Sequence, residues 1–346
     1  MDMDKAKLEY IWLDGYEPTQ NMRSKTMVRS EFGGTLEECP MWMFDGSSTK
    51  QAEGRDSEVL IKPQAIFSDP FHKAEESSGV EGSFLVMCDT YLPTMEPHPT
   101  NSRHSAQETF NKYAELESLF GIEQEFFITK NNKVLGFSGA PYTEPFSQGD
   151  YYCSIGASNS IGREFIEEAF ENCLKAGLRL TGLNAEVAPS QWEFQVCDQG
   201  INVSDQLMMM RYILNRTAEK YGWEITFNPK PIKGEWNGSG CHTNFSTSIM
   251  RAEGGYEHIL NAIELLRENH DYHMLQYGEG NEHRMTGKLE TSNFMKFSSG
   301  IANRGCSIRI PTQTHADKKG YFEDRRPASN IDPYLVSSLI YQTSCL

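Results

Sequence analysis

Four glutamates lie inside segments rich in apolar and aromatic residues, where an unpaired carboxylate is costly to bury. Glu123 and Glu125 alternate, so on a β-strand both carboxylates would point to the same face. Glu186 and Glu193 flank an Ala-Pro-Ser sequence, where a turn would fold them together. A divalent cation with oxygen ligands, Mg²⁺ or Mn²⁺, would neutralise such a cluster. A solvated strand position explains any one of these glutamates, but it does not suit all four together.

One histidine follows a glycine-rich stretch. His242 alternates with Asn244 and Ser246 on a predicted strand, and the preceding run 237–240 contains two glycines. Glycine allows the backbone to approach a ligand closely, so this histidine is a candidate ligand, with an ordinary core histidine as the alternative.

Arginines gather in the last quarter of the chain, at positions 284, 304, 309 and 325. Guanidinium groups among strand-forming residues of an acidic protein favour phosphate and carboxylate binding, although a surface salt bridge explains any single one. The sequence contains no P-loop and no GxGxxG motif, so a bound nucleotide would require another architecture.

The elements that position these residues fall into two parts. Strand-like runs cover 7–13, 22–32, 58–67 and 82–91, and three prolines within 93–99 predict a stiff connector. We therefore predict a β-rich domain at 5–97 and a second domain at 98–346.

The second part mixes helices and strands, which indicates an α+β class. Helical periodicity covers 160–176, 204–221 and 256–269, with Ser204 as an expected N-cap and Met208–Met210 as expected core residues. Strands are expected at 122–129 and 240–247, with a hairpin across 184–196.

Composition excludes several classes of function. The 346 residues carry a net charge of −16, which argues against a nucleic-acid surface, and no apolar run is long enough to span a membrane. The N-terminus has no apolar segment typical of a secretory signal, and the 8 cysteines form no CxxC pair. A cytoplasmic protein with reduced thiols is expected.

Six motifs occur in one order along the chain. They are Phe-Asp-Gly-Ser-Ser-Thr from Phe44, Gly-Ile-Glu-Gln-Glu from Gly121, the segments 182–194 and 230–244, Asn-Arg-Gly-Cys-Ser-Ile-Arg-Ile-Pro from Asn303, and Gly-Tyr-Phe-Glu-Asp-Arg-Arg-Pro from Gly320. Together they resemble the short eukaryotic-type (class II) glutamine synthetase family, from about Leu8 to the C-terminus.

This resemblance implies an N-terminal β-grasp domain followed by a larger catalytic domain of the glutamine-synthetase/guanidino-kinase type. It also implies two stacked pentameric rings with active sites between neighbouring subunits. The implied reaction joins ammonium to the γ-carboxylate of glutamate with ATP as co-substrate and at least two Mg²⁺ or Mn²⁺ ions per site.

The resemblance assigns roles to individual positions. The implied metal ligands are Glu125, Glu186 and Glu193 for one ion, and Glu123, His242 and Glu323 for the other. The implied substrate-binding residues are Arg284, Arg325, Asn237 and Gly238, and the implied catalytic residues are Asp45, Tyr152, Glu290 and Arg304. The implied nucleotide-binding residues are Asn244, Phe245, Ser246, Arg309, Tyr321 and Phe322.

Two alternatives remain open: a ligase of the same fold that uses another small amine, and a catalytically inactive structural relative. The sequence also departs from the family pattern at three positions, Leu119, Glu235 and Leu289. These departures bear on substrate affinity, and none removes an expected catalytic group.

Overall fold

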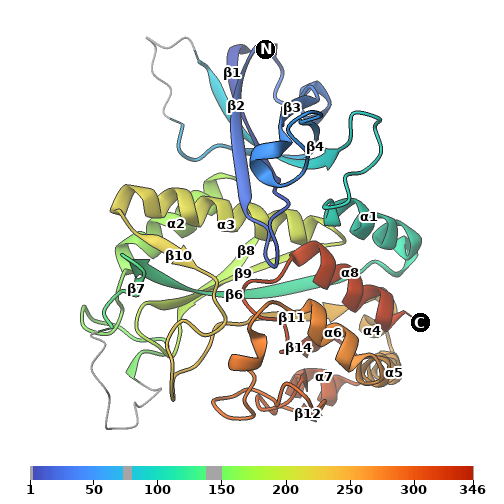
Figure 1. The fold of residues 1–346 in the computed structure, drawn as a ribbon. Coiled ribbons are helices and arrows are strands. Elements are labelled where there is room, and N and C mark those ends of the chain that lie inside the picture. The colour runs from blue at the N-terminus through green and yellow to red at the C-terminus, as the bar shows by residue number, and fades with distance from the viewer. Residues whose placement is uncertain (1–2, 73–79, 138–149, 346) are drawn as a thin grey trace. The chain divides into compact units, whose positions relative to one another are not determined.

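The computed structural model describes residues 3–72, 80–137 and 150–345 (Figure 1). Backbone contacts divide the chain into two compact units, Met1–Ser105 with Glu171–Leu178, and Ala106–Phe170 with Arg179–Leu346. The boundary between residues 97 and 98 stays a prediction. No helix in the described ranges combines the length and hydrophobicity required to cross a lipid bilayer.

The first unit is built on one mixed sheet. Its strands are β1 (Met3–Leu13), β2 (Met22–Phe32), β3 (Trp42–Asp45), β4 (Glu58–Ser68) and β5 (Gly82–Tyr91), in the order β2-β1-β5-β4-β3. Strands β1 and β5 are parallel, and the other neighbours are antiparallel. Alternate residues of β1, such as Leu8 and Tyr10, are buried against Val59, Ile61 and Val86. The four predicted strands are confirmed, and the short β3 is an addition.

The second unit contains a larger sheet. In the described residues its strands are β6 (Leu119–Lys130), β7 (Lys133–Val134), β8 (Leu180–Ala185), β9 (Gln191–Gln199), β10 (Glu224–Thr226), β11 (Cys241–Ser246), β12 (Ser299–Ile301), β13 (Ile308–Ile310) and β14 (Phe322–Asp324). The main order is β12-β13-β14-β11-β6-β9-β8, with β7 and β10 also paired to β6. The predicted hairpin is confirmed as β8 and β9, which are antiparallel.

The helices of the described chain are α1 (Ser102–Lys112), α2 (Arg163–Lys175), α3 (Asn202–Tyr221), α4 (Ser248–Arg251), α5 (Gly255–Glu268), α6 (His270–Gln276), α7 (Thr312–Asp317) and α8 (Pro333–Ser344). Helix α3 packs on β6, β9 and β10, whereas α5 and α6 both pack on α8 (Figure 1). The three predicted helices form within a few residues of their expected ends.

Helix α3 confirms one sequence expectation and corrects another. Met208, Met209 and Met210 are buried, as core residues should be. Ser204 is not the N-cap, because the helix begins at Asn202 and Ile201 occupies the cap position. The Ser204 hydroxyl is within the first turn and donates to the carbonyl oxygen of Pro333 at 3.0 Å, at the start of α8.

A buried polar chain joins β14 to α6 and α8. Asp324 and Arg326 form a fully buried ion pair at 2.7 Å, and the Tyr277 hydroxyl donates to Asp324 at 2.8 Å. His273 contacts Tyr277 through Nδ1 at 2.6 Å and Thr343 through Nε2 at 2.9 Å. Burial, followed by the charge of Arg326, lowers the pKa of His273 from 6.5 to about 3.

The low pKa of His273 predicts a pH-dependent stability. The unfolded chain takes up a proton near the ordinary pKa and the folded chain does not, so this contribution is complete above that pKa and is lost as the pH falls toward 3. Wild type should lose roughly 2 kcal/mol more unfolding free energy than His273→Gln between about pH 7 and pH 5. Urea titrations of both proteins at several pH values measure this difference. Equal losses would contradict it.

Candidate active site

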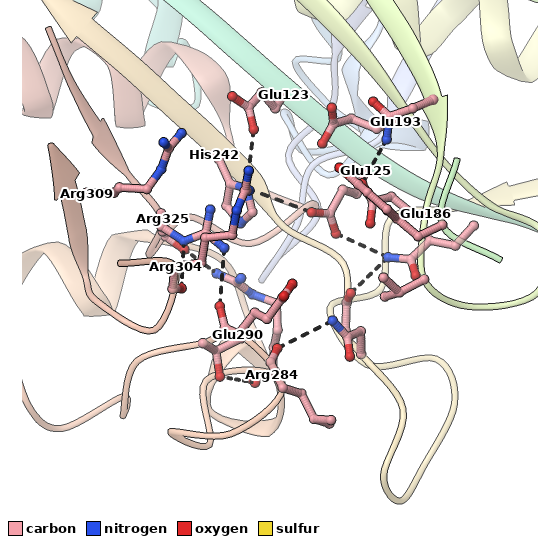
Figure 2. Close-up of a pocket in the computed structure, with 18 of the residues that line it drawn as sticks. Glu123, Glu125, Glu186, Glu193, His242, Arg284, Glu290, Arg304, Arg309 and Arg325 are labelled. Carbon is pink, nitrogen blue, oxygen red and sulfur yellow. Dashed lines mark hydrogen bonds and ion pairs between the residues drawn. The ribbon is translucent and has the colours of Figure 1, made fainter. Parts of the chain in front are cut away.

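A cavity of about 410 Å³ opens in the second unit. Carboxylates occupy one side and arginines the other, with Glu290 on a loop beside Arg284 (Figure 2). The lining contains the predicted residues Glu123, Glu125, Tyr152, Glu186, Glu193, Asn237, Gly238, His242, Arg284, Glu290, Arg304, Arg309 and Arg325. Acidic ligands for cations and cationic ligands for anions therefore meet in a single cavity.

Strand register brings the carboxylates together. Glu125 on β6 pairs directly with Glu193 on the neighbouring strand β9. Two residues earlier on β6, Glu123 lies opposite His242 of β11 on one side and Gln195 of β9 on the other. Like charges directly opposite each other on a sheet are unfavourable, so this register requires a neutralising cation or a proton.

The carboxylates and the histidine form two separate groups. Glu125, Glu186 and Glu193 offer donor atoms that all lie within 4.8 Å of one another, and so do Glu123, His242 and Glu323. These are the same two sets that the sequence resemblance implied. Five carboxylates and one imidazole form an oxygen-rich donor set that suits Mg²⁺ or Mn²⁺.

The pKa values of two members of the first group, Glu186 and Glu193, also favour a divalent cation. Burial raises the pKa of Glu186 well above its ordinary value, and Glu125 and Glu193 add to the shift. Burial and the neighbouring Glu123 and Glu125 raise the pKa of Glu193 to about 8. The cluster therefore resists ionisation in isolation, and a divalent cation would remove that resistance.

His242 is held in the neutral state. Burial, followed by the charge of Arg325, lowers the pKa of His242 to about 4. A neutral imidazole retains a lone pair, which is the form that binds a metal ion. Gly240 keeps space open beside this ring, because a Cβ there would lie 2.8 Å from His242 Nε2.

Glu323 connects the histidine to two arginines. Its side chain is completely buried, accepts from Arg325 Nη1 at 2.8 Å, and also pairs with Arg309. One of its oxygens lies 3.7 Å from His242 Nδ1. Two guanidinium groups are thus fixed at the edge of the second carboxylate group, where they could contact phosphate oxygens.

Arg284 lies on the arginine side of the cavity, where hydrogen bonds hold its side chain. Its Nε donates to Asn281 Oδ1 at 3.0 Å, and its Nη2 donates to the carbonyl oxygens of Arg325, Arg326 and Pro327 at 3.0, 2.8 and 3.1 Å. Burial lowers the pKa of Arg284 to about 10, so the guanidinium stays charged at neutral pH. Fixed geometry and charge suit recognition of a carboxylate.

The backbone near Gly238 leaves no space for a side chain. A Cβ at Gly238 would lie 2.3 Å from the carbonyl oxygen of Pro229 and 2.5 Å from Arg284 Cγ. Asn237 extends from this loop and donates to the carbonyl oxygen of Leu289 at 3.4 Å. The glycine therefore lets the loop lie directly against Arg284.

The loop that carries Glu290 has an unusual backbone. Leu289 and Glu290 adopt φ values of 54° and 60°, in the left-handed region that most side chains avoid. The Glu290 carbonyl oxygen accepts from Arg325 Nη2 at 3.2 Å, and Arg325 Nε donates to the carbonyl oxygen of Arg304 at 3.0 Å. Arg325 thus holds two loops that contribute residues to the cavity lining.

The expected nucleotide-binding residues are only partly brought to the cavity. Arg309 lines it, whereas Phe245 and Phe322 are fully buried against each other at 5.6 Å between ring centroids. A nucleotide could therefore contact these two phenylalanines only through their backbone. Ser246 is buried and its hydroxyl accepts from Arg251 at 2.9 Å, while Tyr321 is 41% exposed.

Asn244 has a different local role. Its Nδ2 donates to Glu123 Oε1 at 2.8 Å and to the carbonyl oxygen of Gly121 at 3.1 Å. The amide group of Asn244 therefore orients a carboxylate of the second group.

Asp45 belongs to the first unit, at the end of β3, and it is described there by itself. One carboxylate oxygen accepts from the Ser47 amide at 3.0 Å and the Ser47 hydroxyl at 2.6 Å, and the other accepts from Ser48 at 3.0 Å. These hydrogen bonds lower the pKa of Asp45, so it is ionised at neutral pH. Tyr152 lines the cavity of the second unit and is about half exposed.

Sequence reasoning missed several polar residues at the site. Asn184, Gln191 and Gln195 line the cavity, and Asn281 supports Arg284 from behind. A signal for two of them was present, because Gln191 and Gln195 each stand two positions from Glu193 on a strand and therefore share its face.

Comparison with known proteins gives a consistent result. The family model for the β-grasp domain of glutamine synthetase matches residues 4–93, and that for its catalytic domain matches residues 99–256. Glutamine synthetase cytosolic isozyme 1-1 of Oryza sativa subsp. japonica is 47% identical over 348 residues, covering 99% of this chain and 95% of the relative.

Two further relatives are also glutamine synthetases, and they match this chain at similar identity. Chloroplastic glutamine synthetase of Zea mays is 48% identical, with 99% of this chain and 80% of the relative covered. Glutamine synthetase of Agaricus bisporus is 46% identical, with 99% and 94% covered. With both domain models matched in order and the whole chain aligned at this identity, the protein belongs to the short eukaryotic-type glutamine synthetase family.

Proposed function

We propose that this chain is a glutamate–ammonia ligase, which forms glutamine, ADP and phosphate from glutamate, ammonia and ATP through γ-glutamyl phosphate. The observation that carries the proposal is the cavity in which two carboxylate groups face four arginines. The names of its relatives, glutamine synthetases at about 47% identity over the whole chain, support the same reaction.

Glu125, Glu186 and Glu193 hold one Mg²⁺ or Mn²⁺ in this proposal, and Glu123, His242 and Glu323 hold a second. When bound, the two ions offset the negative charge of the ATP phosphates. The high pKa of Glu193 supports this assignment, because two facing carboxylates need an opposing charge to remain ionised.

The arginines position the two anionic substrates. Arg284 and Arg325 bind the α-carboxylate of glutamate beside the Asn237–Gly238 loop, while Arg304 and Arg309 contact the transferring phosphoryl group and the nucleotide phosphates. Asn244, Phe245, Ser246, Tyr321 and Phe322 form the nucleotide side, with the two phenylalanines acting through backbone groups or as support. The γ-carboxylate then attacks the γ-phosphorus of ATP and breaks its bond to the bridging oxygen, so that ADP leaves and a poor acyl donor becomes an acyl phosphate.

Ammonium binds among Asp45, Tyr152 and Glu290. Carboxylates attract the cation, and Asp45 takes its proton so that neutral ammonia attacks the acyl phosphate. Glu290 also keeps water from the acyl phosphate. Two acidic groups at this subsite favour ammonia over a bulky apolar amine.

The assembly is two stacked pentameric rings, in which Asp45 of one subunit completes the site of its neighbour, and the compartment is the cytoplasm. The Asp45 carboxylate is exposed and held by hydrogen bonds, which supports a site that is completed by a neighbouring subunit. The relatives include cytosolic isozymes, which support a cytoplasmic location, and they also include chloroplastic enzymes.

The reaction itself is the first test. Purified protein supplied with glutamate, ATP and ammonium should form glutamine and ADP in equal amounts, and methylamine should replace ammonium poorly. Exhaustive chelation should abolish activity, and Mg²⁺ or Mn²⁺ should restore it, because five of the six proposed ligands are carboxylates. Full activity after chelation would exclude the two-metal assignment.

Glu290 should control how the intermediate is partitioned. If its side chain binds ammonium and excludes water, Glu290→Ala should lose glutamine formation more than ATP hydrolysis, by about 10-fold or more. The ratio of phosphate to glutamine measures this partition, with the exposed Glu282→Ala as a control. A ratio equal to that of wild type would assign Glu290 to assembly or binding alone.

Complementation between inactive variants tests the shared site. Asp45→Ala and Arg325→Ala oligomers should each be nearly inactive, because one lacks the proposed base and the other a substrate clamp. After co-expression in equal amounts, about a quarter of the sites should combine one intact half from each parent. Native mass spectrometry verifies that the chains have mixed. Mixed oligomers as inactive as their parents would place Asp45 in the site of its own chain.

A further inference from the structure

Four glutamates that line the cavity each accept a hydrogen bond from an amide side chain. The donor–acceptor pairs are Asn244 Nδ2 to Glu123 Oε1 at 2.8 Å, Gln191 Nε2 to Glu125 Oε2 at 3.2 Å, Asn184 Nδ2 to Glu186 Oε1 at 2.9 Å and Gln195 Nε2 to Glu193 Oε1 at 2.7 Å. We infer that these amides are positioning residues that fix the carboxylates in the orientation that binds the metal ions, with Gln195 as the principal member.

The pattern follows from the sheet. Gln195 and Glu193 are two residues apart on β9, so their side chains share a face. Gln195 lies directly opposite Glu123 of β6, and Asn184 of β8 lies directly opposite Glu193. Along β9 the carboxylate of Glu193 therefore lies between the amides of Gln191 and Gln195, and each of the four carboxylates has a neutral donor within reach.

An amide is suited to this position for an electrostatic reason. It donates a hydrogen bond to a carboxylate without bringing a positive charge that would compete with a divalent cation. In each pair the bond involves one named oxygen of the glutamate, which leaves the other oxygen for a cation. A hydrogen bond from an amide to the carboxylate fixes the rotamer of the glutamate, which charge repulsion would otherwise push away from its neighbours.

The backbone is shaped around Gln195. Gly182 pairs with Gln195 across β8 and β9, and a Cβ at Gly182 would lie 2.6 Å from Gln195 Oε1. Alanine at position 182 would therefore displace the amide of Gln195. Because the displaced group is the end of a flexible side chain, the fold should tolerate this change.

The orientation of a second amide is determined by its surroundings. Gln191 Nε2 lies 3.2 Å from Glu125 Oε2 and 2.9 Å from the carbonyl oxygen of Gly238, and both of these atoms are acceptors. The nitrogen must therefore face them. Gln191 consequently links a glutamate of the first metal group to the loop proposed to bind the amino acid substrate.

The test measures metal binding rather than turnover, and it rests on the proposed two-metal site. Metal-free oligomers are titrated with Mn²⁺, and free Mn²⁺ is followed by electron paramagnetic resonance without nucleotide or glutamate. Gln195→Met keeps the size of the side chain and removes the donor, and Gly182→Ala displaces the amide. Gln199→Met is the control, because Gln199 is an exposed glutamine on the same strand.

Gln195→Met and Gly182→Ala should each weaken Mn²⁺ binding by roughly 10- to 100-fold, whereas Gln199→Met should bind as wild type does. Activity of the two weakened variants should recover as Mn²⁺ is raised, so the loss appears in the metal requirement more than in kcat. Their circular dichroism spectra and oligomer mass should match wild type.

Two outcomes separate this inference from the proposed function. Wild-type affinity in a folded Gln195→Met oligomer would overturn the positioning role while leaving the two-metal site intact. Absence of Mn²⁺ binding in wild type itself would overturn the proposed site and the inference with it. If Gln195→Met fails to assemble, the Mn²⁺ affinity of Gly182→Ala tests the inference instead. An assembled Gly182→Ala oligomer that binds Mn²⁺ as tightly as wild type would also contradict it.

Discussion

The structure of the second unit depends on carboxylates that face one another across neighbouring strands. Glu125 and Glu193 are paired in register, and Glu186 lies close enough for its donor atom to complete a cluster. Burial and mutual repulsion raise the pKa of Glu186 and Glu193, so this arrangement is unfavourable without a compensating charge. Such a cluster attracts a divalent cation strongly. A binding site is the usual reason for a protein to keep carboxylates in this unfavourable arrangement.

The arginine side of the cavity contains buried positive charges, which are stabilised in two ways. The Arg284 side chain donates hydrogen bonds to carbonyl oxygens and to Asn281, which join its guanidinium to fixed dipoles that a substrate does not have to displace. Glu323 instead forms ion pairs with Arg309 and Arg325 while also belonging to the second carboxylate group. One residue of β14 therefore connects the arginine side of the cavity to the carboxylate side.

Behind β14, the buried chain from Arg326 through Asp324 and Tyr277 to His273 joins the strand to α6 and α8. Its groups are mutually hydrogen bonded, so removing one would leave others buried without a partner. The position of Glu323 and Arg325, which flank Asp324 in sequence, is thus fixed from the interior of the unit. Buried hydrogen bonds hold β14 from behind, and the Glu290 loop is joined to it through a backbone contact with Arg325.

The sequence by itself determined the main strands, the long helices and the family, because periodicity and ordered motifs are local properties of the chain; through that family it also implied the two groups of carboxylates and histidine that the structure brings together. It did not determine that Ser204 lies inside its helix, since local capping preference was overridden by packing against the start of α8. Only the tertiary structure showed that Phe245 and Phe322 are core residues, although they alternate with site residues on their strands. Strand register decided the remainder: it placed Glu125 opposite Glu193 and Gln195 opposite Glu123, and register depends on pairing between distant segments that no local pattern specifies.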